Sequence, residues 1–409
     1  MAITFIQKPQ KFTPSNNDIM FQVVSDSIDL AYFLVEVKDS AGVTISTLKL
    51  RPTPVYRTGA FFNLNNVLTS KTTIVKTDNL VEYTTDVIGY SVKVTAYKIN
   101  TDGTAAATGD PNTFSGAFVY NAKLPIDAFS AYDYTAYVAS TLGTGRFLTT
   151  RPTQSDIAPL ATEYLYYMND SRATKVVFKS YYTNGTVVSK TVALTLTQKM
   201  GRINISPLVL EANGVVLTNL VYYTVELQDA VSGVAVQPVY RYLKTKCSIS
   251  NVQLFWKNDL GGVDSYLFKN MRESISNTKI TAASSSYKLS TGNLYSNNDK
   301  NIFYPTDVNL QSETTSTYTL VSEYLTNNEA RWITGVIKSK EVYVLLENRK
   351  LYPVQIKDNN ASIQNTRYTS QLNQFEVSFT APSSGTDGVS IQMYTGEEYF
   401  PYILPITYV

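Results

Sequence analysis

The feature that most constrains the fold is a succession of short apolar runs, each bounded by Gly, Asn, Asp or Pro. Runs such as residues 31–37, 90–96 and 342–346 are rich in β-branched and aromatic side chains. Pairs such as Asn184-Gly185 and Asp102-Gly103 separate them and are typical of hairpin turns. Apolar residues at a helical spacing of 3.6 are scarce, so the sequence predicts an all-β chain.

The chain also resembles itself. Three pairs of segments match in the same order, at offsets of 143, 142 and 140 residues. The pairs are 42–50 with 185–194, 59–68 with 201–210, and 79–84 (NLVEYT) with 219–224 (NLVYYT). Matches that recur in register indicate a repeated structural unit. We therefore expect tandem, Ig-like β-sandwich domains related by internal duplication, over residues 1–155 and 156–275.

The segment LFWKNDLGGVDSYLF, residues 254–268, is the strongest candidate for chemistry because it places Asp259 and Asp264 around a Gly-Gly pair. Its counterpart in the first copy is expected to be TLGTGRFL, residues 141–148, which keeps a Leu-Gly turn but neither carboxylate. Turns require glycine wherever φ is positive. Gly143, Gly261 and Gly262 are therefore predicted to be structural turn residues, and neither a phosphate site nor a metal site is expected.

The C-terminal part of the chain departs from the repeat. Residues 276–305 are rich in Ser and Asn and are predicted to form a polar loop or an extended arm. Residues 306–409 are predicted to form a third β domain with a docking tail. Because that tail is apolar and aromatic, it is expected to dock on this chain or on a neighbour, with Tyr399, Phe400 and Tyr402 as interface candidates.

Composition excludes several classes of function. The absence of histidine removes the usual general base and the commonest metal ligand. A single cysteine, Cys247, permits neither an intramolecular disulfide nor a cysteine-based zinc site. A net charge of +2 without a basic run is unlike a nucleic-acid-binding protein. No cofactor, metal, nucleic-acid partner or membrane association is therefore expected.

Three elements carry a resemblance to a known class of protein: the N-terminal pattern from Phe5 to Phe21, residues 254–262, and residues 341–354. They resemble virion proteins of tailed phages, in particular the short-tailed, crAss-like phages that infect Bacteroidota. The resemblance implies a structural component of the virion, such as a tail or collar ring or a head fibre, assembled in the host cytoplasm. Its partners would be copies of itself and other virion proteins, such as the portal, neighbouring tail rings or the capsid. The family offers no catalytic residues.

Three functions remain open from the residues. The leading hypothesis is a non-enzymatic assembly protein that forms a homo-oligomeric layer. The second is a receptor- or glycan-binding module, with the aromatic cluster at residues 163–167 as a platform for sugar rings. The third is a carboxylate glycosidase using Glu397 and Glu398, or Asp259 with Asp264, because a pair of acids can hydrolyse glycosides without histidine.

Overall fold

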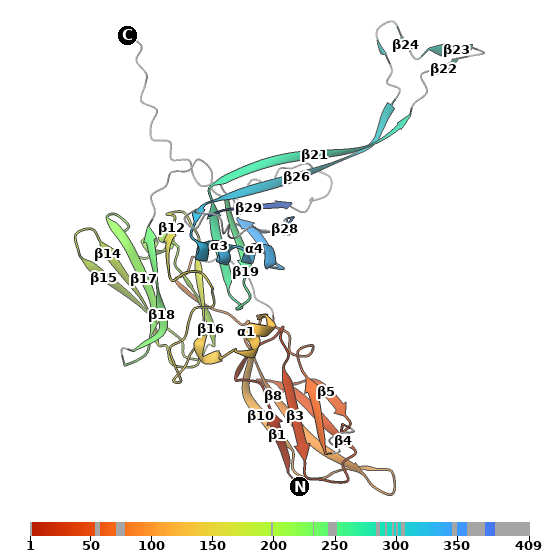
Figure 1. The fold of residues 1–409 in the computed structure, drawn as a ribbon, viewed down its shortest axis with the longest axis vertical. Helices are drawn as coiled ribbons and strands as arrows, with labels where there is room; N and C mark the ends of the chain where they lie inside the picture. The colour runs from red at the N-terminus through yellow and green to blue at the C-terminus, as the bar shows by residue number, and fades with distance from the viewer. Residues whose placement is uncertain are drawn as a thin grey trace, which may run out of the picture.

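A computed structural model describes most of the chain before residue 381. The described residues are 2–53, 58–70, 78–197, 199–231, 233–243, 252–283, 287–290, 293–296, 298–299, 302–303, 307–345, 350–357 and 373–380. These residues form three successive β regions with a few short helices (Figure 1). The predicted all-β class is confirmed.

The N-terminal region is a sandwich of two sheets. One sheet has the order β1 (Ile3–Gln7), β3 (Met20–Ser25), β6 (Gly59–Asn63). The other has the order β2 (Phe12–Pro14), β10 (Asn112–Tyr120), β8 (Ile88–Ile99), β4 (Tyr32–Asp39), β5 (Thr44–Leu50), with β9 (Ala105–Ala107) paired to β8. Along β4, Phe33, Val35 and Val37 are buried and alternate with more exposed residues. This period of two directs one face of the strand into the space between the sheets.

The second region is also a sandwich, and short helices lie in its connections. Its five-stranded sheet has the order β12 (Gln154–Ile157), β18 (Val234–Leu243), β17 (Leu220–Gln228), β14 (Lys175–Tyr182), β15 (Val187–Ala193). Its four-stranded sheet has the order β11 (Val138–Ala139), β13 (Tyr164–Asn169), β16 (Met200–Asn204), β7 (Val81–Tyr83). The helical segments are α1 (Ile126–Ser130), η1 (Tyr134–Ala136) and α2 (Pro207–Ala212).

The larger sheets of the two sandwiches share one topology. The order β5-β4-β8-β10-β2 corresponds to β15-β14-β17-β18-β12, and in both sheets only the last pair is parallel. Two of the three matched sequence pairs fall on equivalent strands, β5 with β15 and β6 with β16. The third does not, because 79–84 leads into β7 whereas 219–224 begins β17, whose topological counterpart is β8.

The third region is built on a seven-stranded sheet. Its order is β20 (Val263–Phe268), β19 (Val252–Lys257), β27 (Val342–Leu345), β28 (Leu351–Ile356), β29 (Asn373–Thr380), β26 (Asp307–Leu325), β21 (Asn270–Ala283). Helices α3 (Asn327–Ile333) and α4 (Gly335–Lys338) contribute the buried Trp332 and Val336 to its core. Strands β19 and β20 thus pair within this sheet, whereas the sequence interpretation placed residues 252–268 in the second sandwich. The apolar run over these residues indicates a strand but not which sheet receives it.

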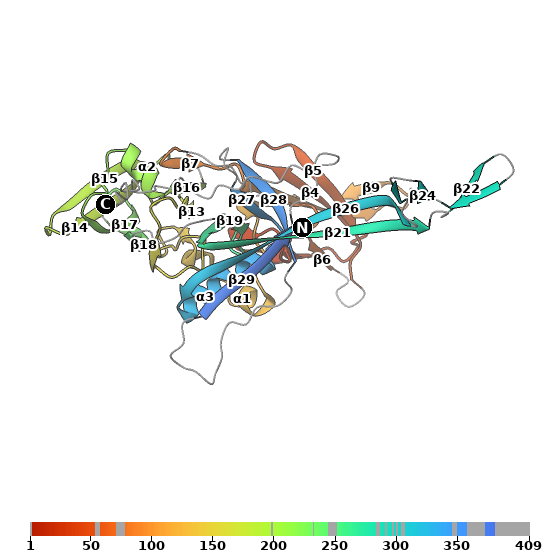
Figure 2. The same ribbon diagram turned by 90° about the horizontal axis from the view of Figure 1, so that it is seen from above.

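A long antiparallel arm extends from the third sheet (Figures 1 and 2). Strand β21 pairs with β26 along its whole length, from Asn270 opposite Val321 to Ala283 opposite Asp307. Short strands lie near its tip: β22 (Tyr287–Ser290), β23 (Asn293–Ser296), β24 (Asn298–Asp299) and β25 (Ile302–Phe303). Figure 2 shows the arm and the second sandwich at opposite ends of the molecule. The described residues of the predicted polar segment, 276–305, therefore belong to this β arm and to the short strands near its tip.

Side chains from all three regions meet in one central cluster. Phe12 and Tyr120 come from the N-terminal sandwich, Tyr166 from the second, and Phe255 and Leu345 from the third, and all five are almost fully buried. A shared apolar cluster of this kind holds neighbouring β regions together, because separating them would expose it to water.

Candidate functional site

A strand from the N-terminal part of the chain completes the second sandwich. Strand β7 pairs with β16, and the Asn204 amide donates to the Leu80 carbonyl at 2.9 Å. The buried Arg202 guanidinium forms an ion pair with Glu82 and lies over the Tyr164 ring at 5.0 Å. This segment, residues 78–84, is called the β7 clasp below. It gives the second sandwich an edge strand that its own part of the chain does not supply.

The Leu-Gly-Gly turn between β19 and β20 contacts the other two regions. Gly261 has φ of +91°, and a side chain there would meet the Asn121 carbonyl and the Tyr120 ring at 3.0 Å. A side chain at Gly262 would overlap the Leu148 carbonyl. The side chain of Asn258 accepts from the Gly262 amide at 3.0 Å and donates to the Leu148 carbonyl at 2.8 Å. Both glycines therefore allow close backbone approach, as expected for structural turn residues.

Segment 141–148 is not the structural equivalent of this turn. Gly143 forms an isolated bridge with Ser140, and no strand follows it. A side chain added at Gly143 would have only the Thr135 carbonyl nearby, at 3.9 Å. The expected equivalence with residues 259–268 is therefore wrong. The short Leu-Gly pattern is shared, but the two segments occupy different places and touch each other through Leu148.

Asp264 is buried, and its carboxylate is hydrogen-bonded by three side chains of the protein. Its carboxylate accepts hydrogen bonds from Thr149 Oγ1 at 2.7 Å, Asn258 Nδ2 at 3.0 Å and Trp332 Nε1 at 3.0 Å. Burial raises the pKa of Asp264, and these three donors only partly offset that effect. The side chain of Asp259 is exposed instead. The two acids of the candidate pair thus lie in different environments.

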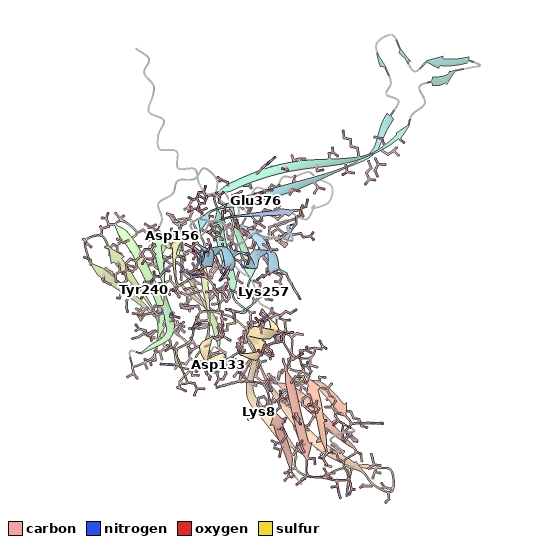
Figure 3. The ribbon with its side chains drawn as sticks, in the orientation of Figure 1. Lys8, Asp133, Asp156, Tyr240, Lys257 and Glu376 are labelled. Carbon is pink, nitrogen blue, oxygen red and sulfur yellow. The ribbon has the colours of Figure 1, made fainter. Side chains whose placement is uncertain are left out.

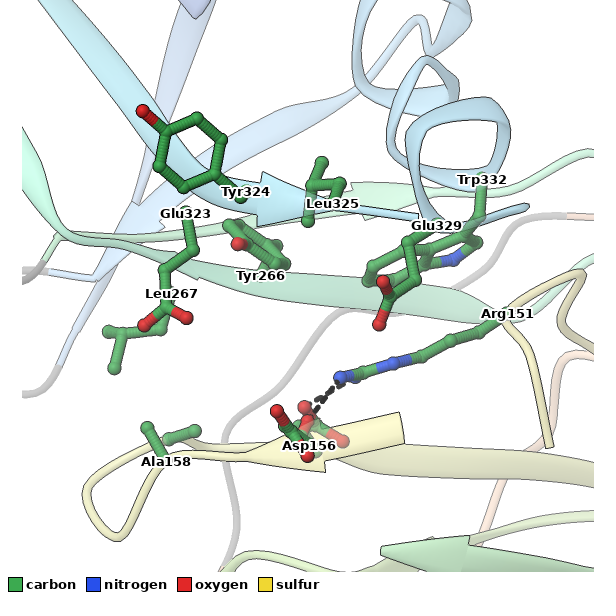
Figure 4. Close-up of a pocket in the computed structure, with 12 residues that line it drawn as sticks. Arg151, Asp156, Ala158, Tyr266, Leu267, Glu323, Tyr324, Leu325, Glu329 and Trp332 are labelled. Carbon is green, nitrogen blue, oxygen red and sulfur yellow. Dashed lines mark hydrogen bonds and ion pairs between the residues drawn. The ribbon is translucent and has the colours of Figure 1, made fainter. Parts of the chain in front are cut away.

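A small polar cavity of about 100 Å³ lies between the second sandwich and the third region (Figure 4). Glu163 at its wall pairs with Arg151 and, at 3.4 Å, with the buried Arg241. Arg151 also donates to the Asp156 carbonyl at 3.0 Å and stacks on Trp332 at 4.6 Å. Burial, together with the like charge of Arg151, lowers the pKa of Arg241 to about 10.

This arrangement suits cohesion better than catalysis. A general acid or base needs a carboxylate that is free to exchange a proton with a substrate. Glu163 is held by two guanidinium groups, and Asp264 by three donors. Within the described ranges, no group of three or more metal-binding side chains is brought together. The described helices are also too short or too polar to cross a membrane.

Figure 3 places Asp156 and Lys257 close to the junction of the regions. Lys257, at the end of β19, lies 3.9 Å from Glu341, and burial lowers its pKa. This ion pair joins the start of the β19–β20 turn to the segment that leads into β27. Its role is local, because both partners belong to the third region.

The outer arm offers the clearest exposed surface. Beyond the pair Thr317–Thr380, β26 keeps β21 as its only sheet neighbour among the described residues. The exposed fractions of Ile275, Ile280 and Leu310 are 68%, 54% and 68%. A two-stranded ribbon without a core is marginally stable in water. The arm therefore exposes apolar side chains that the described part of this chain does not cover.

Other predicted site residues divide into two groups. Tyr164, Tyr166 and Tyr167 are at least 92% buried, so the aromatic cluster at 163–167 is not a platform for sugar rings, and that expectation is wrong. Every residue of β13 is buried, so both faces of this strand pack inside the protein. The remaining candidates, Tyr399, Phe400, Tyr402, Glu397 and Glu398, lie outside the described residues, as does Cys247.

Sequence reasoning missed Arg151, Asn258 and the β7 clasp. The Asn-Asp-Leu-Gly-Gly sequence contains a usable signal, since an Asn side chain often bonds the backbone two residues later, as Asn258 does with Leu260 at 3.0 Å. The clasp carries no such local signal, because its partner β16 is distant in the chain. Arg151 pairs with Glu163, 12 residues later, and no motif marks that pair. No protein-family model matches the chain, and no curated protein matches its sequence.

Proposed function

We propose that this chain is a non-enzymatic structural subunit that forms a homo-oligomeric layer, and that the layer is a tail or collar ring of a phage virion. The observation that carries the proposal is the arm of β21 and β26, which extends beyond the third sheet with exposed apolar side chains. In the proposed assembly, the arm contacts a neighbouring copy, and the ring joins the portal or neck to the distal tail.

Copies of the same chain are the favoured partner because closed rings of identical subunits bury such arms without leaving an unpaired end. The sequence resemblance supports the virion setting, and the engaged carboxylates of the junction support a role other than catalysis. Interface residues in this proposal are Ile275 and Ile280 on the arm, with Tyr399, Phe400 and Tyr402 in the C-terminal segment. The layer would assemble in the host cytoplasm without nucleic acid or membrane.

Light scattering coupled to gel filtration tests the proposal directly. The full chain is expected to give one oligomer of constant mass over a wide concentration range, and negative-stain images are expected to show rings. An arm-shortened variant, in which Asn-Gly replaces residues 276–315 between the paired Ile275 and Ser316, is expected to be monomeric and to keep cooperative thermal unfolding. A full chain that remains monomeric at high concentration would contradict the proposal.

A milder pair of substitutions tests whether assembly depends on the arm in particular or on exposed apolar side chains in general. Ile275→Lys with Ile280→Lys is expected to weaken assembly at least tenfold, because charges would be buried at the contact. Ile28→Lys is the matched control, since Ile28 is 87% exposed and lies in the N-terminal sandwich. Equal effects of the arm and control variants would count against the arm as the contact.

The alternative is a head fibre or a receptor- or glycan-binding module of the virion. One feature favours it: the half-exposed tyrosines 181, 222 and 242 form a row across three strands of the second sandwich, with the rings of Tyr181 and Tyr222 stacked at 4.3 Å. Because these two rings cover each other, they present edges and hydroxyls more than open faces. Binding on a glycan array that is lost in Tyr222→Ala would favour this alternative.

A further inference from the structure

A basic and apolar groove lies on the third region, near the base of the arm. It has a volume of about 630 Å³ and is formed by the end of α4 with strands β27 and β28. Ile337, Val342, Val354 and Ile356 line it, and Lys338 and Lys340 are exposed at its rim. Among the described residues, neither lysine has an acidic partner within ion-pair distance. The groove therefore fits a segment that is both apolar and acidic.

The end of the chain has this character. Residues 368–409 contain no Lys, Arg or His, and Glu397 and Glu398 directly precede the apolar sequence YFPYILPITYV. Pro401 and Pro405 in that sequence cannot donate to a β ladder. The segment is thus suited to lie in a groove through its side chains, in an extended conformation, rather than to add a strand to a sheet.

The chain also leaves the third sheet beside this groove. Thr380, the last residue of β29, pairs with Gln355, which is one of the residues that line the groove. Residues 381–396 can extend over about 50 Å. Each copy therefore carries a groove together with a long tether to a segment of complementary charge.

We propose that residues 397–409 of one copy bind the groove of a second copy, with Glu397 and Glu398 facing Lys338 and Lys340. The inference rests on the proposed function, since it names the surface that receives the C-terminal segment within the homo-oligomer. In the proposed ring the contact is heterologous: the copy that receives a segment in its groove passes its own segment to a third copy, not back to the first. A heterologous contact that repeats around an axis closes into a ring, whereas a self-complementary contact would stop at a dimer.

Disulfide trapping in the full chain tests this contact. In a Cys247→Ser background, one chain carries Ser339→Cys in the groove and another, distinguished by a size tag, carries Tyr399→Cys. After mixing and mild oxidation, a covalent heterodimer is expected, at least tenfold more abundant than with a control chain carrying Lys98→Cys in place of Ser339→Cys. Lys98 is an exposed residue of the N-terminal sandwich.

Charge reversal provides the specific check. Lys338→Glu with Lys340→Glu is expected to lower trapping about tenfold, and Glu397→Lys with Glu398→Lys on the partner chain is expected to restore it. Failure of this rescue would overturn the proposed pairing of charges. A double-cysteine chain that forms only an internal disulfide would overturn the inference in favour of docking within one copy.

Light scattering on the same samples distinguishes a failure of the groove contact from a failure of the proposed assembly function. An oligomer that forms without trapping at Ser339→Cys overturns the groove contact and leaves the assembly function standing. A strictly monomeric chain removes both. Trapping above the control, together with rescue, supports the groove contact.

Discussion

The two sandwiches have larger sheets of the same strand order, but they differ in how their smaller sheets end. Among the described residues of the N-terminal sandwich, β6 is an edge strand, next to β3 alone. In the second sandwich, its counterpart β16 is covered by β7, which comes from the chain between β6 and β8. The common topology is what a duplication predicts. The difference shows that the second sandwich depends on a segment encoded within the first.

That dependence has a physical consequence. An uncovered edge strand exposes unpaired backbone groups and invites pairing with other chains. The β7 clasp satisfies this edge with residues of the same chain and adds the Arg202–Glu82 ion pair. The two sandwiches are therefore expected to differ in their response to the same kind of substitution, and four predictions test this expectation and the junction between the regions.

The largest effect is expected at the junction itself. Asp264→Ala would leave the Thr149, Asn258 and Trp332 donors buried without an acceptor. The expected loss in the free energy of unfolding is about 4 kcal/mol, measured by urea denaturation. Asp259→Ala is the control, because that side chain is exposed, and its effect is expected within about 0.5 kcal/mol. Similar losses in both variants would show that the hydrogen-bond network is not the cause.

The next effect tests the clasp. Leu80 is 8% exposed and packs in the core of the second sandwich although it precedes β7 in the N-terminal part of the chain. Leu80→Ala is expected to cost about 2–3 kcal/mol. Hydrogen exchange is expected to speed up in β13 and β16 and to remain unchanged in β4. Faster exchange in β4 instead would mean that the clasp supports the first sandwich.

A smaller effect separates the two Leu-Gly turns. Gly262→Ala would force a methyl group against the Leu148 carbonyl, at an expected cost of about 2 kcal/mol. Gly143→Ala meets only an ordinary contact at 3.9 Å, so its thermal midpoint is expected to change little. Equal destabilisation of the two variants in thermal denaturation would argue against the close approach at Gly262.

The smallest effect concerns an ion cluster between the two sandwiches. Burial would raise the pKa of Asp170, but hydrogen bonds from Lys11 and Lys199 outweigh it, so the pKa is lowered. Asp170→Asn is expected to cost at most about 1 kcal/mol at neutral pH, because the group is only partly buried.

The pH dependence of the stability difference between wild type and Asp170→Asn shows whether the ionised Asp170 carboxylate stabilises the folded protein. A lowered pKa contributes stability above the unfolded-state value of about 3.9, and this contribution is lost as the pH falls through the folded-state pKa. The difference between wild type and Asp170→Asn is therefore expected to shrink towards zero in acid, as measured by urea denaturation at several pH values. A difference that grows as the pH falls would contradict this assignment.

Local patterns predicted the elements well and their partners poorly. The alternating run at 31–37 and the Asn-Gly turn at 184–185 mark β4 and the β14–β15 hairpin, because each signal is contained in a few neighbouring residues. The repeat found β5 with β15 and β6 with β16. It failed at 79–84, because this segment forms β7 in the second sandwich and not a strand of the first.

In the candidate site, too, local features could be predicted from the sequence and long-range contacts could not. Gly261 and Gly262 were predictable as turn residues, since glycine's backbone freedom is a property of the residue. The burial of Asp264 was not, because its donors Thr149 and Trp332 are far from it in sequence. Nor could the sequence show that Tyr164 and Tyr166 are buried, since a tyrosine is equally suited to a core and to a surface.

By itself, the sequence determined the all-β class, the alternation of the sandwich strands and the turn at Gly261 and Gly262. These follow from spacing and composition, which act over a few residues. Only the tertiary structure decided that β7 pairs in the second sandwich and that β19 and β20 belong to the third sheet. It also decided that Asp264 is buried at the junction of the regions. Strand pairing and burial depend on surfaces formed by distant segments, and those surfaces exist only once the chain has folded.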